Sequence, residues 1–579
     1  MSTLYTRYVK ESYTPSGELE SLQFNIDENF NFSLDIIDGI AQEEPSRPAL
    51  IWVNPEGEEH HFSFGDIKYW SDKTASFFQS IGVKAGDAVL VIVRRHYQFW
   101  FIAAALNKLG AIMVPATFML KEHDLEYRLK AAHIKHIICT HTGDICQVLD
   151  NLEDQGKTFE LENKIIVHGG TAGFGFDNLS DNEEALREPQ KLEVCQLSAE
   201  RLGWIDFNSG VRKASDSFSA YRPCASEGML MYFTSGTSGN PKMVLHDASY
   251  ALAHLVTAKH WHQVRPSGVH LSIADTGWGK AVWGKYYGQW LMGACVLAYD
   301  FDRFNPEEIL NLVARFNITT LCCPPTMYRL MMQASLDNYD LSSLEHCTTA
   351  GEALNPDLFN FWLDHVGLKI YEGFGQTETP LTVGNLVNST PRIGSMGKPS
   401  PLYTLEIQRP DGTRCNTGES GEICIKIDPK PVGIMMEYYL NPEKTAQAMH
   451  DGWYHTGDTA WVDEDGYFWY VGRNDDVIKS SGYRIGPFEI ESVLLEHSAV
   501  REVAITGVPD ELRGSIVKAN IVLASGFEPS DELTQELQTW VKRKTAPYKF
   551  PRIIEYMNAL PKTVNGKIRR AELRSKDSK

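Results

Sequence analysis

The stretch VHLSIAD (residues 269–275) opens the part of the chain that decides the fold. It is an apolar run of strand length, and similar runs return at ACVLAYD (294–300), TTLCCPP (319–325), HCTTAGE (346–352) and LKIYEGFG (368–375). Helical stretches such as NPEEILNLVARF (305–316) separate these runs. Strands that alternate with helices predict a parallel sheet covered by helices. Ligands bind beyond the carboxyl ends of strands in such sheets, so Gly351, Glu352 and the segment 372–375 are candidate site positions.

The same pattern occurs earlier, where the runs AVLVIV (88–93), AIMVPA (111–116), IKHIICT (134–140) and KIIVHG (164–169) alternate with amphipathic stretches. From about 395 to 470 the chain changes to short alternating segments with Gly turns, which predict an antiparallel barrel or sandwich. The expected fold is α/β. A large N-terminal domain (1–472) holds two parallel α/β subdomains and a small β-barrel. A polar hinge, RNDD (473–476), leads to a smaller mobile α+β C-terminal domain (477–579).

Composition narrows the classes of function. The net charge of −20 argues against a nucleic-acid partner, but residues 541–579 carry twelve Lys and Arg against three acidic residues. A basic end on an acidic protein is either solvated or binds a polyanionic small molecule. The N-terminus lacks the apolar core of a signal peptide, and the apolar stretch 99–116 is interrupted by Asn107 and Lys108, so we expect no membrane span. Ten cysteines without paired spacing indicate reduced thiols, and we expect a cytoplasmic protein.

The stretch YFTSGTSGNPKMV (232–244) follows an apolar strand and combines two glycines, hydroxyl side chains and one lysine. Backbone N–H groups, hydroxyls and an ammonium group are suited to binding a phosphate chain. The glycine spacing and Met243 after Lys242 do not fit a P-loop, which needs a hydroxyl residue there. A flexible Gly/Ser surface loop is the alternative interpretation.

Four motifs in this order resemble those of the ANL superfamily of adenylating enzymes: YFTSGTSGNPK (232–242), YEGFGQTET (371–379), the long run from YHTGD (454–458) to SSGYRI (480–485), and PKTVNGK (561–567). The segments ADTGW (274–278), GEAL (351–354) and SSGYRIGPFEIE (480–491) look most like the medium-chain acyl-CoA synthetases. The resemblance implies that ATP and a carboxylate form an acyl-adenylate and pyrophosphate, and that the thiol of coenzyme A then takes the acyl group.

The resemblance also implies the nucleotide site. The first reaction needs charge neutralisation and alignment rather than a general base, because a carboxylic acid is ionised at neutral pH. Glu378 is the expected Mg²⁺ ligand, Asp458 would bind the ribose hydroxyls, and Arg473 would contact ribose or phosphate. The phosphates and adenine would be held by Thr234, Ser235, Gly236, Thr237, Ser238, Gly239, Lys242, Gly351, Glu352, Ala353, Glu372, Gly373, Phe374, Gly375, Gln376 and Thr377.

Lys567 is the main catalytic candidate, with Thr234 and Glu378 beside it in the first step. In this family the C-terminal domain rotates about the residue that corresponds to Asp475, which withdraws the lysine and brings a CoA-binding segment to the site. The expected CoA contacts are Ser481, Gly482, Tyr483, Arg484, Arg513 and Lys542.

The acyl pocket is expected to involve Gly351, Gly375, Trp261, Trp278, Lys280 and Trp283. The acetyl-CoA synthetases carry tryptophan at the position of Gly375, so glycine would open space for a medium-chain, branched or aryl acid. We interpret Lys280 as a solvated or snorkelling side chain rather than a substrate contact.

Two other classes of protein fit part of the pattern. One is an adenylating enzyme without a CoA step, and the other is an inactive ATP- or acyl-binding homologue. We expect small-molecule partners only, no nucleic acid, no integral membrane association, and a monomer or homodimer.

Overall fold

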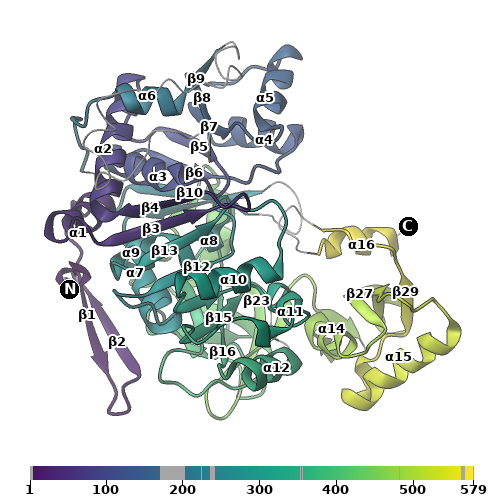
Figure 1. Cartoon of the computed structure of the whole chain (residues 1–579). Helices are drawn as coiled ribbons and strands as arrows, with labels where there is room; N and C mark the ends of the chain where they lie inside the picture. Colours follow the sequence, from purple (N-terminus) through teal and green to yellow (C-terminus); the bar gives the residue numbers. More distant parts are fainter. Residues whose placement is uncertain are drawn as a thin grey trace.

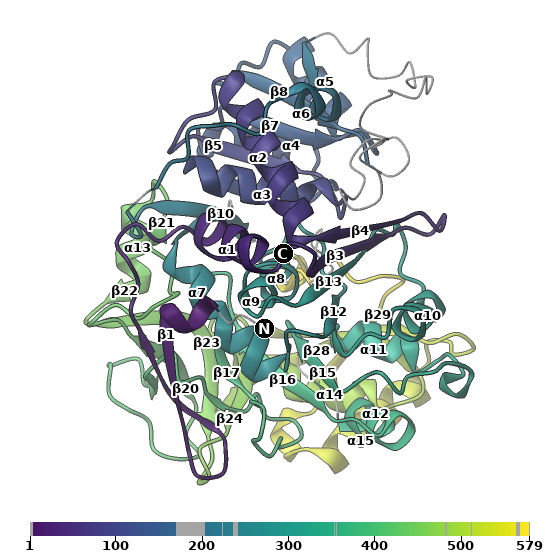
Figure 2. The same cartoon turned by 60° about the vertical axis from the view of Figure 1, so that its left-hand side comes forward.

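The computed structural model describes residues 4–169, 203–222, 224–234, 241–352, 354, 356–480, 483–510, 512–562 and 568–577. In these residues the chain forms two large mixed sheets, a smaller antiparallel sheet and a C-terminal unit (Figure 1). The first large sheet lies at the top of the molecule and the second below it in both Figure 1 and Figure 2. The predicted α/β class is therefore confirmed.

The first sheet has eight strands in the order β21-β11-β10-β6-β5-β7-β8-β9. The pairings from β10 to β9 are parallel, and β11 and β21 extend the sheet in antiparallel fashion. Its strands are β5 (Ala88–Ile92), β6 (Ile112–Pro115), β7 (His136–Thr140), β8 (Asn163–Val167), β9 (Trp204–Asp206), β10 (Gly228–Thr234), β11 (Lys242–Asp247) and β21 (Glu437–Tyr438). The helices of this part are α2 (Phe64–Ser80), α3 (Gln98–Leu109), α4 (Glu122–Ala131), α5 (Ile145–Asp154) and α6 (Phe207–Lys213).

The second sheet has nine strands in the order β18-β17-β16-β15-β14-β12-β13-β3-β4. The pairings from β16 to β3 are parallel, and the strands at both edges are antiparallel. Its strands are β3 (Pro48–Val53), β4 (Glu59–Ser63), β12 (Val269–Ser272), β13 (Cys295–Tyr299), β14 (Thr320–Cys322), β15 (His346–Ala350), β16 (Ile370–Gly375), β17 (Leu381–Gly384) and β18 (Lys398–Pro399). Its helices are α7 (Ser249–Leu255), α8 (Gly279–Lys285), α9 (Tyr287–Leu291), α10 (Pro306–Phe316), α11 (Pro325–Met331) and α12 (Pro356–Val366).

Local sequence explains where these helices begin and end. The side chain of Asn305 accepts a hydrogen bond from the backbone of Glu307 at the start of α10, and Pro306 occupies the first turn, where its missing N–H costs nothing. Asn317 ends the helix in the left-handed conformation with φ of 47°. At α2, Ser63 and Asp66 form a capping box.

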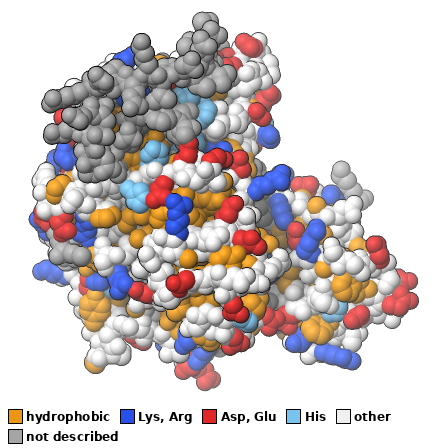
Figure 3. Space-filling view, viewed as in Figure 1, with side chains coloured by type: hydrophobic (Ala, Val, Ile, Leu, Met, Phe, Trp, Pro, Cys, Tyr) orange, Lys and Arg blue, Asp and Glu red, His pale blue; other side chains and the backbone are white. Residues whose placement is uncertain are grey.

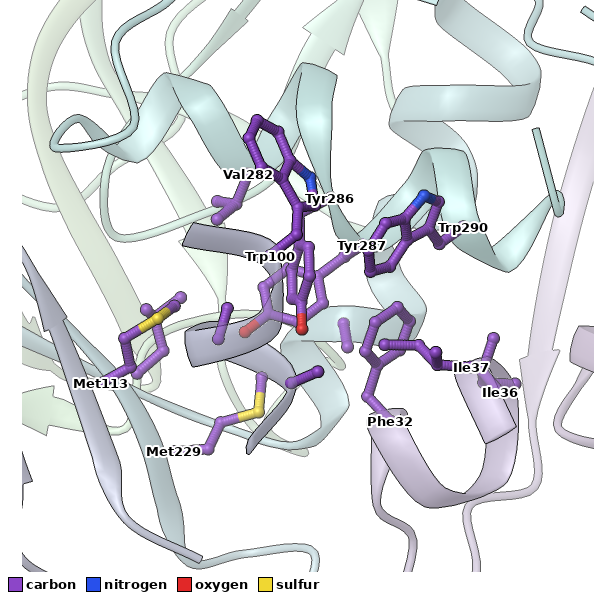
Figure 4. Close-up of a cluster of buried hydrophobic side chains, with 14 of the residues drawn as sticks. Phe32, Ile36, Ile37, Trp100, Met113, Met229, Val282, Tyr286, Tyr287 and Trp290 are labelled. Atoms are coloured by element: carbon purple, nitrogen blue, oxygen red, sulfur yellow. The ribbon is translucent and has the colours of Figure 1, made fainter. Parts of the chain in front are cut away.

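One hydrophobic core joins the two sheets. Phe32 and Ile36 from the N-terminal segment, Trp100 of α3, and Tyr286 and Trp290 at α9 lie together in it (Figure 4). Phe32 makes an edge contact with Tyr287, with ring centroids 4.9 Å apart. The short α1 (Asp38–Glu43) follows this N-terminal segment, and the hairpin of β1 (Val9–Tyr13) and β2 (Leu19–Phe24) precedes it. The two predicted subdomains are thus packed as one body.

The segment after β18 forms the predicted antiparallel unit. It contains β19 (Leu405–Gln408), β20 (Gly421–Lys426), β22 (Met449–His450), β23 (Trp453–Val462) and β24 (Phe468–Arg473), with α13 (Pro442–Ala448) before β22. All their pairings are antiparallel.

The C-terminal unit is a separate α+β body at the right of Figure 1. It consists of the pair β25 (Ile478–Ser480) and β26 (Tyr483–Ile485), the sheet β27 (Val500–Asp510), β28 (Gly514–Leu523) and β29 (Ile553–Tyr556), and the helices α14 (Pro487–Leu495), α15 (Asp531–Lys544) and α16 (Arg570–Asp577). Figure 3 shows Lys and Arg side chains gathered where this unit meets the rest of the molecule.

Candidate functional site

The two ends of the glycine-rich loop lie side by side. β10 ends at Thr234 and β11 begins at Lys242, and these two residues face each other in an antiparallel pair. Ser235, Gly236, Thr237, Ser238 and Gly239 lie outside the described residues. The described residues on both sides of this segment therefore belong to two paired strands, of which the sequence predicted only the first.

A hydrogen-bonded chain links Lys242 to Glu378 through Tyr438. The Lys242 ammonium donates to the Tyr438 hydroxyl at 3.0 Å, and that hydroxyl donates to Oε1 of Glu378 at 2.8 Å. The ammonium also lies 4.4 Å from the centroid of the Tyr438 ring. Burial and the neighbouring Glu378 carboxylate raise the pKa of Tyr438, so its hydroxyl stays protonated, while burial lowers the pKa of Lys242. Sequence reasoning missed Tyr438.

A second network surrounds the carboxylate of Asp458, which is buried on β23. Its Oδ2 accepts from Nε2 of Gln376 at 2.5 Å and from Arg473 at 3.3 Å, and its Oδ1 accepts from the Tyr470 hydroxyl at 2.9 Å. Burial alone would lower the pKa of Arg473, but Asp458, Tyr470, Asp475 and Glu378 together outweigh burial, and the pKa is raised. Tyr454 donates to Gln376 at 2.6 Å. Neither tyrosine was assigned a role from the sequence.

Thr377 lies between these two networks, and its backbone carbonyl accepts a hydrogen bond from His246 at 2.8 Å. The ring of His246 stacks on Tyr250 with centroids 3.8 Å apart. Buried neighbours therefore hold the backbone at Thr377, between Gln376 and Glu378.

The expected adenine region lies at the carboxyl ends of β15 and β16, where Ala350 pairs with Gly373. Glu372 is buried, its carboxylate accepts from the backbone of Leu354 at 3.3 Å, and burial raises its pKa to about 8. Glu352 is exposed and accepts from Thr326 at 2.7 Å. The half-buried ring of Phe374 lies 6.1 Å from that of Tyr470. Ala353 lies outside the described residues.

The expected acyl pocket brings Trp261, Trp283, Gly373 and Gly375 together. The two indoles meet edge to face at 6.1 Å. The expectation that Gly375 leaves open space is wrong, because a β-carbon there would lie 2.3 Å from Cη2 of Trp283. The indole of Trp283 on α8 occupies that space, and the glycine permits this close approach. A β-carbon at Gly373 would similarly lie 2.7 Å from Trp261.

Lys280 and Gly351 adjoin this group. The Lys280 ammonium donates to the carbonyl of Ala350 and lies 3.8 Å from the place where a β-carbon of Gly351 would sit. Lys280 is half-buried and bonded to a strand end, so it is not a fully solvated side chain, and the snorkelling alternative stays a prediction. Trp278 is half-buried at the N-terminus of α8.

The positions assigned to coenzyme A lie in the C-terminal unit. Tyr483 and Arg484 pair with β25, and the turn that carries Arg513 lies beside β25, because a β-carbon at Gly514 would be 3.5 Å from the carbonyl of Lys479. Lys542 is exposed on α15, with its ammonium 4.0 Å from the centroid of the Phe550 ring. Ser481, Gly482 and Lys567 lie outside the described residues.

The expected hinge has two acidic residues in different surroundings. Asp475 is exposed, with Oδ1 4.0 Å from Nε of Arg473. Asp476 is buried and forms ion pairs with Arg570 and Arg574 of α16. α16 starts three residues after Lys567, so the segment next to the expected catalytic lysine is tied to this junction.

A cavity of about 330 Å³ opens beside Lys242 and Arg473. Lys444 adds a third positive charge to its wall, so the cavity is suited to an anionic ligand. The remaining lining residues are Glu422, Tyr438, Gln447, Ala448, His450, His455, Thr456 and Gly457.

Comparison with known proteins agrees with this geometry. The family model of the AMP-binding enzyme matches residues 37–439, and that of the AMP-binding enzyme C-terminal domain matches residues 489–567. The fold and the site thus define an adenylate-forming ligase, and the chain belongs to the AMP-binding enzyme family.

Individual relatives narrow the class. The chain is 40% identical to acyl-coenzyme A synthetase ACSM5, mitochondrial, of Mus musculus, covering 95% of this chain and 91% of that protein. It is 38% identical to acyl-coenzyme A synthetase ACSM3, mitochondrial, of Homo sapiens, covering 97% and 92%. The structure of the anthranilate CoA ligase AuaEII in complex with anthranoyl-AMP superimposes with a TM-score of 0.81 at 27% identity, covering 95% and 98%. Within its family the chain belongs to the acyl-coenzyme A synthetases, so the predicted resemblance is confirmed.

The expected cytoplasmic location is wrong, because these relatives are named mitochondrial enzymes. Unpaired cysteines indicate a reducing compartment but do not distinguish one such compartment from another. No helix among the described residues is long and apolar enough to cross a membrane.

Proposed function

We propose that this acyl-coenzyme A synthetase activates a medium-chain, branched or aryl carboxylic acid. The acid and ATP form the acyl-adenylate and pyrophosphate, and the thiol of coenzyme A then displaces AMP to give the thioester. The observation that carries the proposal is the convergence of the Lys242–Tyr438–Glu378 chain with the Asp458–Arg473 pair at one cavity.

In the first half-reaction the side chains of this cavity orient ATP and balance its charge. Lys242 and Arg473 face the triphosphate, and Thr234 anchors the loop that wraps it. Asp458 presents two acceptor oxygens to the ribose hydroxyls, which would replace the hydrogen bonds that Gln376 and Tyr470 now donate. Lys567 would neutralise the charge that develops between the attacking carboxylate and the α-phosphate.

Glu378 fits the role of a Mg²⁺ ligand. Its carboxylate is nearly buried, Oε1 accepts from Tyr438, and no described residue donates a hydrogen bond to Oε2. A single carboxylate together with phosphate oxygens is the usual way that proteins hold this ion. When bound, Mg²⁺ would neutralise part of the phosphate charge.

The second half-reaction requires the C-terminal unit to turn about Asp475, with 1–472 and 477–579 as the two bodies. The exposure of Asp475 supports this proposal, because a residue at the surface can change its backbone angles without disturbing a core. Ser481, Gly482, Tyr483 and Arg484 would then face coenzyme A, with Arg513 and Lys542 near its phosphates.

The proposed acyl site lies against Trp261 and Trp283. Because Trp283 covers Gly375, its indole forms the wall that limits chain length. Trp278, Lys280 and Gly351 would then lie near the carboxylate that is activated.

The decisive experiment measures pyrophosphate release and thioester formation with acetate, butyrate, hexanoate, octanoate and benzoate, each with and without coenzyme A. The proposal expects both products, with the highest kcat/KM for one of the acids longer than acetate. Pyrophosphate without thioester would identify an adenylating enzyme that lacks the CoA step. No release with any acid would identify an inactive homologue. Light scattering would separate the proposed monomer from a homodimer.

A further inference from the structure

Three side chains of metal-ligand type meet on the antiparallel sheet, away from Glu378. Glu422 and Cys424 stand two residues apart on β20 and so point to the same face. His455 of β23 pairs directly with Cys424 across the strands. The ligand atoms of all three residues lie within 4.8 Å of one another.

The spacing of these atoms matches a tetrahedral zinc site. Nδ1 of His455 lies 3.5 Å from Sγ of Cys424 and 3.2 Å from Oε2 of Glu422. With ordinary zinc bond lengths and tetrahedral angles, the nitrogen–sulfur edge is about 3.6 Å and the nitrogen–oxygen edge about 3.4 Å. The distances from Nδ1 of His455 to the sulfur and to the oxygen therefore nearly match those of a zinc site. The third distance, between Sγ of Cys424 and the Glu422 oxygen, is within 4.8 Å and would shorten through side-chain rotation.

The surroundings hold two of the ligands in place. The backbone N–H of Gly457 donates to Oε1 of Glu422 at 2.8 Å, which leaves Oε2 directed at His455. The His455 ring stacks on His450 with centroids 4.0 Å apart and planes inclined by 11°. Cys424 is fully buried, whereas the side chains of His455 and Glu422 are 18% and 23% exposed. The exposed parts of the cluster therefore belong to Glu422 and His455 and not to Cys424.

The open side is the cavity of about 330 Å³, whose wall includes both Glu422 and His455. A site with three protein ligands and one open position takes water or another small ligand as the fourth. We propose that Glu422, Cys424 and His455 form a binding site for Zn²⁺ whose fourth position faces this cavity. This site is distinct from the proposed Mg²⁺ position, because a thiolate and an imidazole select zinc over magnesium.

The proposed ion would connect β20 to β23 three residues before Asp458. Its first expected consequence is stability, because a metal that binds only the folded chain raises the midpoint of thermal unfolding. The site would respond to soft divalent ions and not to Mg²⁺.

The test is a titration of the full-length, chelator-treated protein with Co²⁺, followed by displacement with Zn²⁺. Cobalt bound by a thiolate gives a charge-transfer absorption, which reports Cys424 directly. We expect one equivalent of this signal in the wild type, its loss in Cys424→Ser, and its retention in Cys224→Ser, a matched change at a half-buried cysteine on a distant loop. Glu422→Gln keeps the thiolate but removes one ligand. We expect it to weaken binding by at least the about tenfold to hundredfold that follows loss of an outer-shell partner.

Zn²⁺ should also raise the unfolding midpoint of the wild type and of Cys224→Ser, but not that of Cys424→Ser. If Cys424→Ser does not fold, Glu422→Gln carries the comparison alone, since its side chain is partly exposed. Absence of the cobalt signal in the wild type would overturn the proposal, as would equal binding by the wild type and Glu422→Gln.

Discussion

The indole of Trp283 covers Gly375 so closely that a β-carbon on the glycine would lie 2.3 Å from Cη2 of the ring. The carbonyl of Pro380 lies on another side at 2.5 Å from the same point. Gly375 is thus enclosed, and the wall of the proposed acyl site is supplied from α8 and not from the strand. Changes in chain-length preference should therefore follow Trp283.

We expect Trp283→Phe to shift preference toward longer acids. The smaller ring withdraws the wall, and each additional buried methylene contributes about 0.8 kcal/mol, or nearly fourfold in relative kcat/KM. The measurement compares kcat/KM for butyrate, hexanoate and octanoate. Trp362→Phe is the control, because Trp362 is also buried but belongs to a different hydrophobic cluster. An unchanged ratio in a folded Trp283→Phe protein would show that the indole does not limit the site.

The Tyr438 hydroxyl, which links Lys242 to Glu378, is expected to contribute to the rate of adenylate formation. Tyr438→Phe removes one hydroxyl that bonds both residues. A hydrogen bond to a charged group contributes about 1.5–3 kcal/mol, so adenylate formation should fall about tenfold to hundredfold. Pyrophosphate exchange measures this step without coenzyme A. Tyr439→Phe, in which the next ring packs against a hydrophobic cluster, should retain activity. Equal activity in the two variants would exclude the bridge as a functional element.

The motifs mark segments that the structure brings close to one another. Lys242 is linked to Glu378 through Tyr438, and Asp458 accepts a hydrogen bond from Gln376, two residues before Glu378. Tyr438 could not be found this way. It lies on a strand of two residues, and its contact with Lys242 exists only because β21 pairs with β11 across a long separation in sequence.

The position of Trp283 and the pairing of β3 also depend on contacts between distant parts of the chain, which the sequence motifs do not reveal. The direction of an indole depends on which neighbours leave room for it, so its position against Gly375 follows from packing and not from spacing. β3 was assigned to no sheet from the sequence. A short apolar run indicates a possible strand but not its partner, and the partner of β3 is β13, far along the chain.

Glu372 predicts a pH dependence of stability. Burial raises the pKa of its carboxyl to about 8 from an ordinary value of 4.5. Between these values the folded chain holds a proton that the unfolded chain releases, so the free energy of unfolding decreases as pH rises from about 4.5 to 8. Glu372→Gln keeps an oxygen acceptor for Leu354 and removes the titration. The variant should gain stability relative to the wild type across this window, as measured by thermal unfolding at several pH values. The exposed Glu352→Gln should not, and a constant difference between Glu372→Gln and the wild type would contradict the assignment.

The junction between the two bodies gives the last prediction. Buried Asp476 pairs with Arg574 and Arg570, and Arg570 also donates two hydrogen bonds to Glu491 at 2.7 and 2.8 Å. These contacts hold α16 against the segment that is expected to turn, and α16 starts three residues after Lys567. Arg574→Gln should therefore displace the lysine and lower adenylate formation more than thioester formation from supplied acyl-adenylate.

The loss in the first half-reaction should be at least about fivefold, because a broken pair that leaves Asp476 buried costs more than the about 1 kcal/mol of an exposed pair. Arg569→Gln is the matched control, since Arg569 immediately precedes α16, is 58% exposed and pairs with Glu572 of that helix. The two half-reactions are measured separately by pyrophosphate exchange and by thioester formation. If Arg574→Gln lowers both equally, the contact stabilises the C-terminal unit as a whole. If it lowers neither, α16 does not position Lys567.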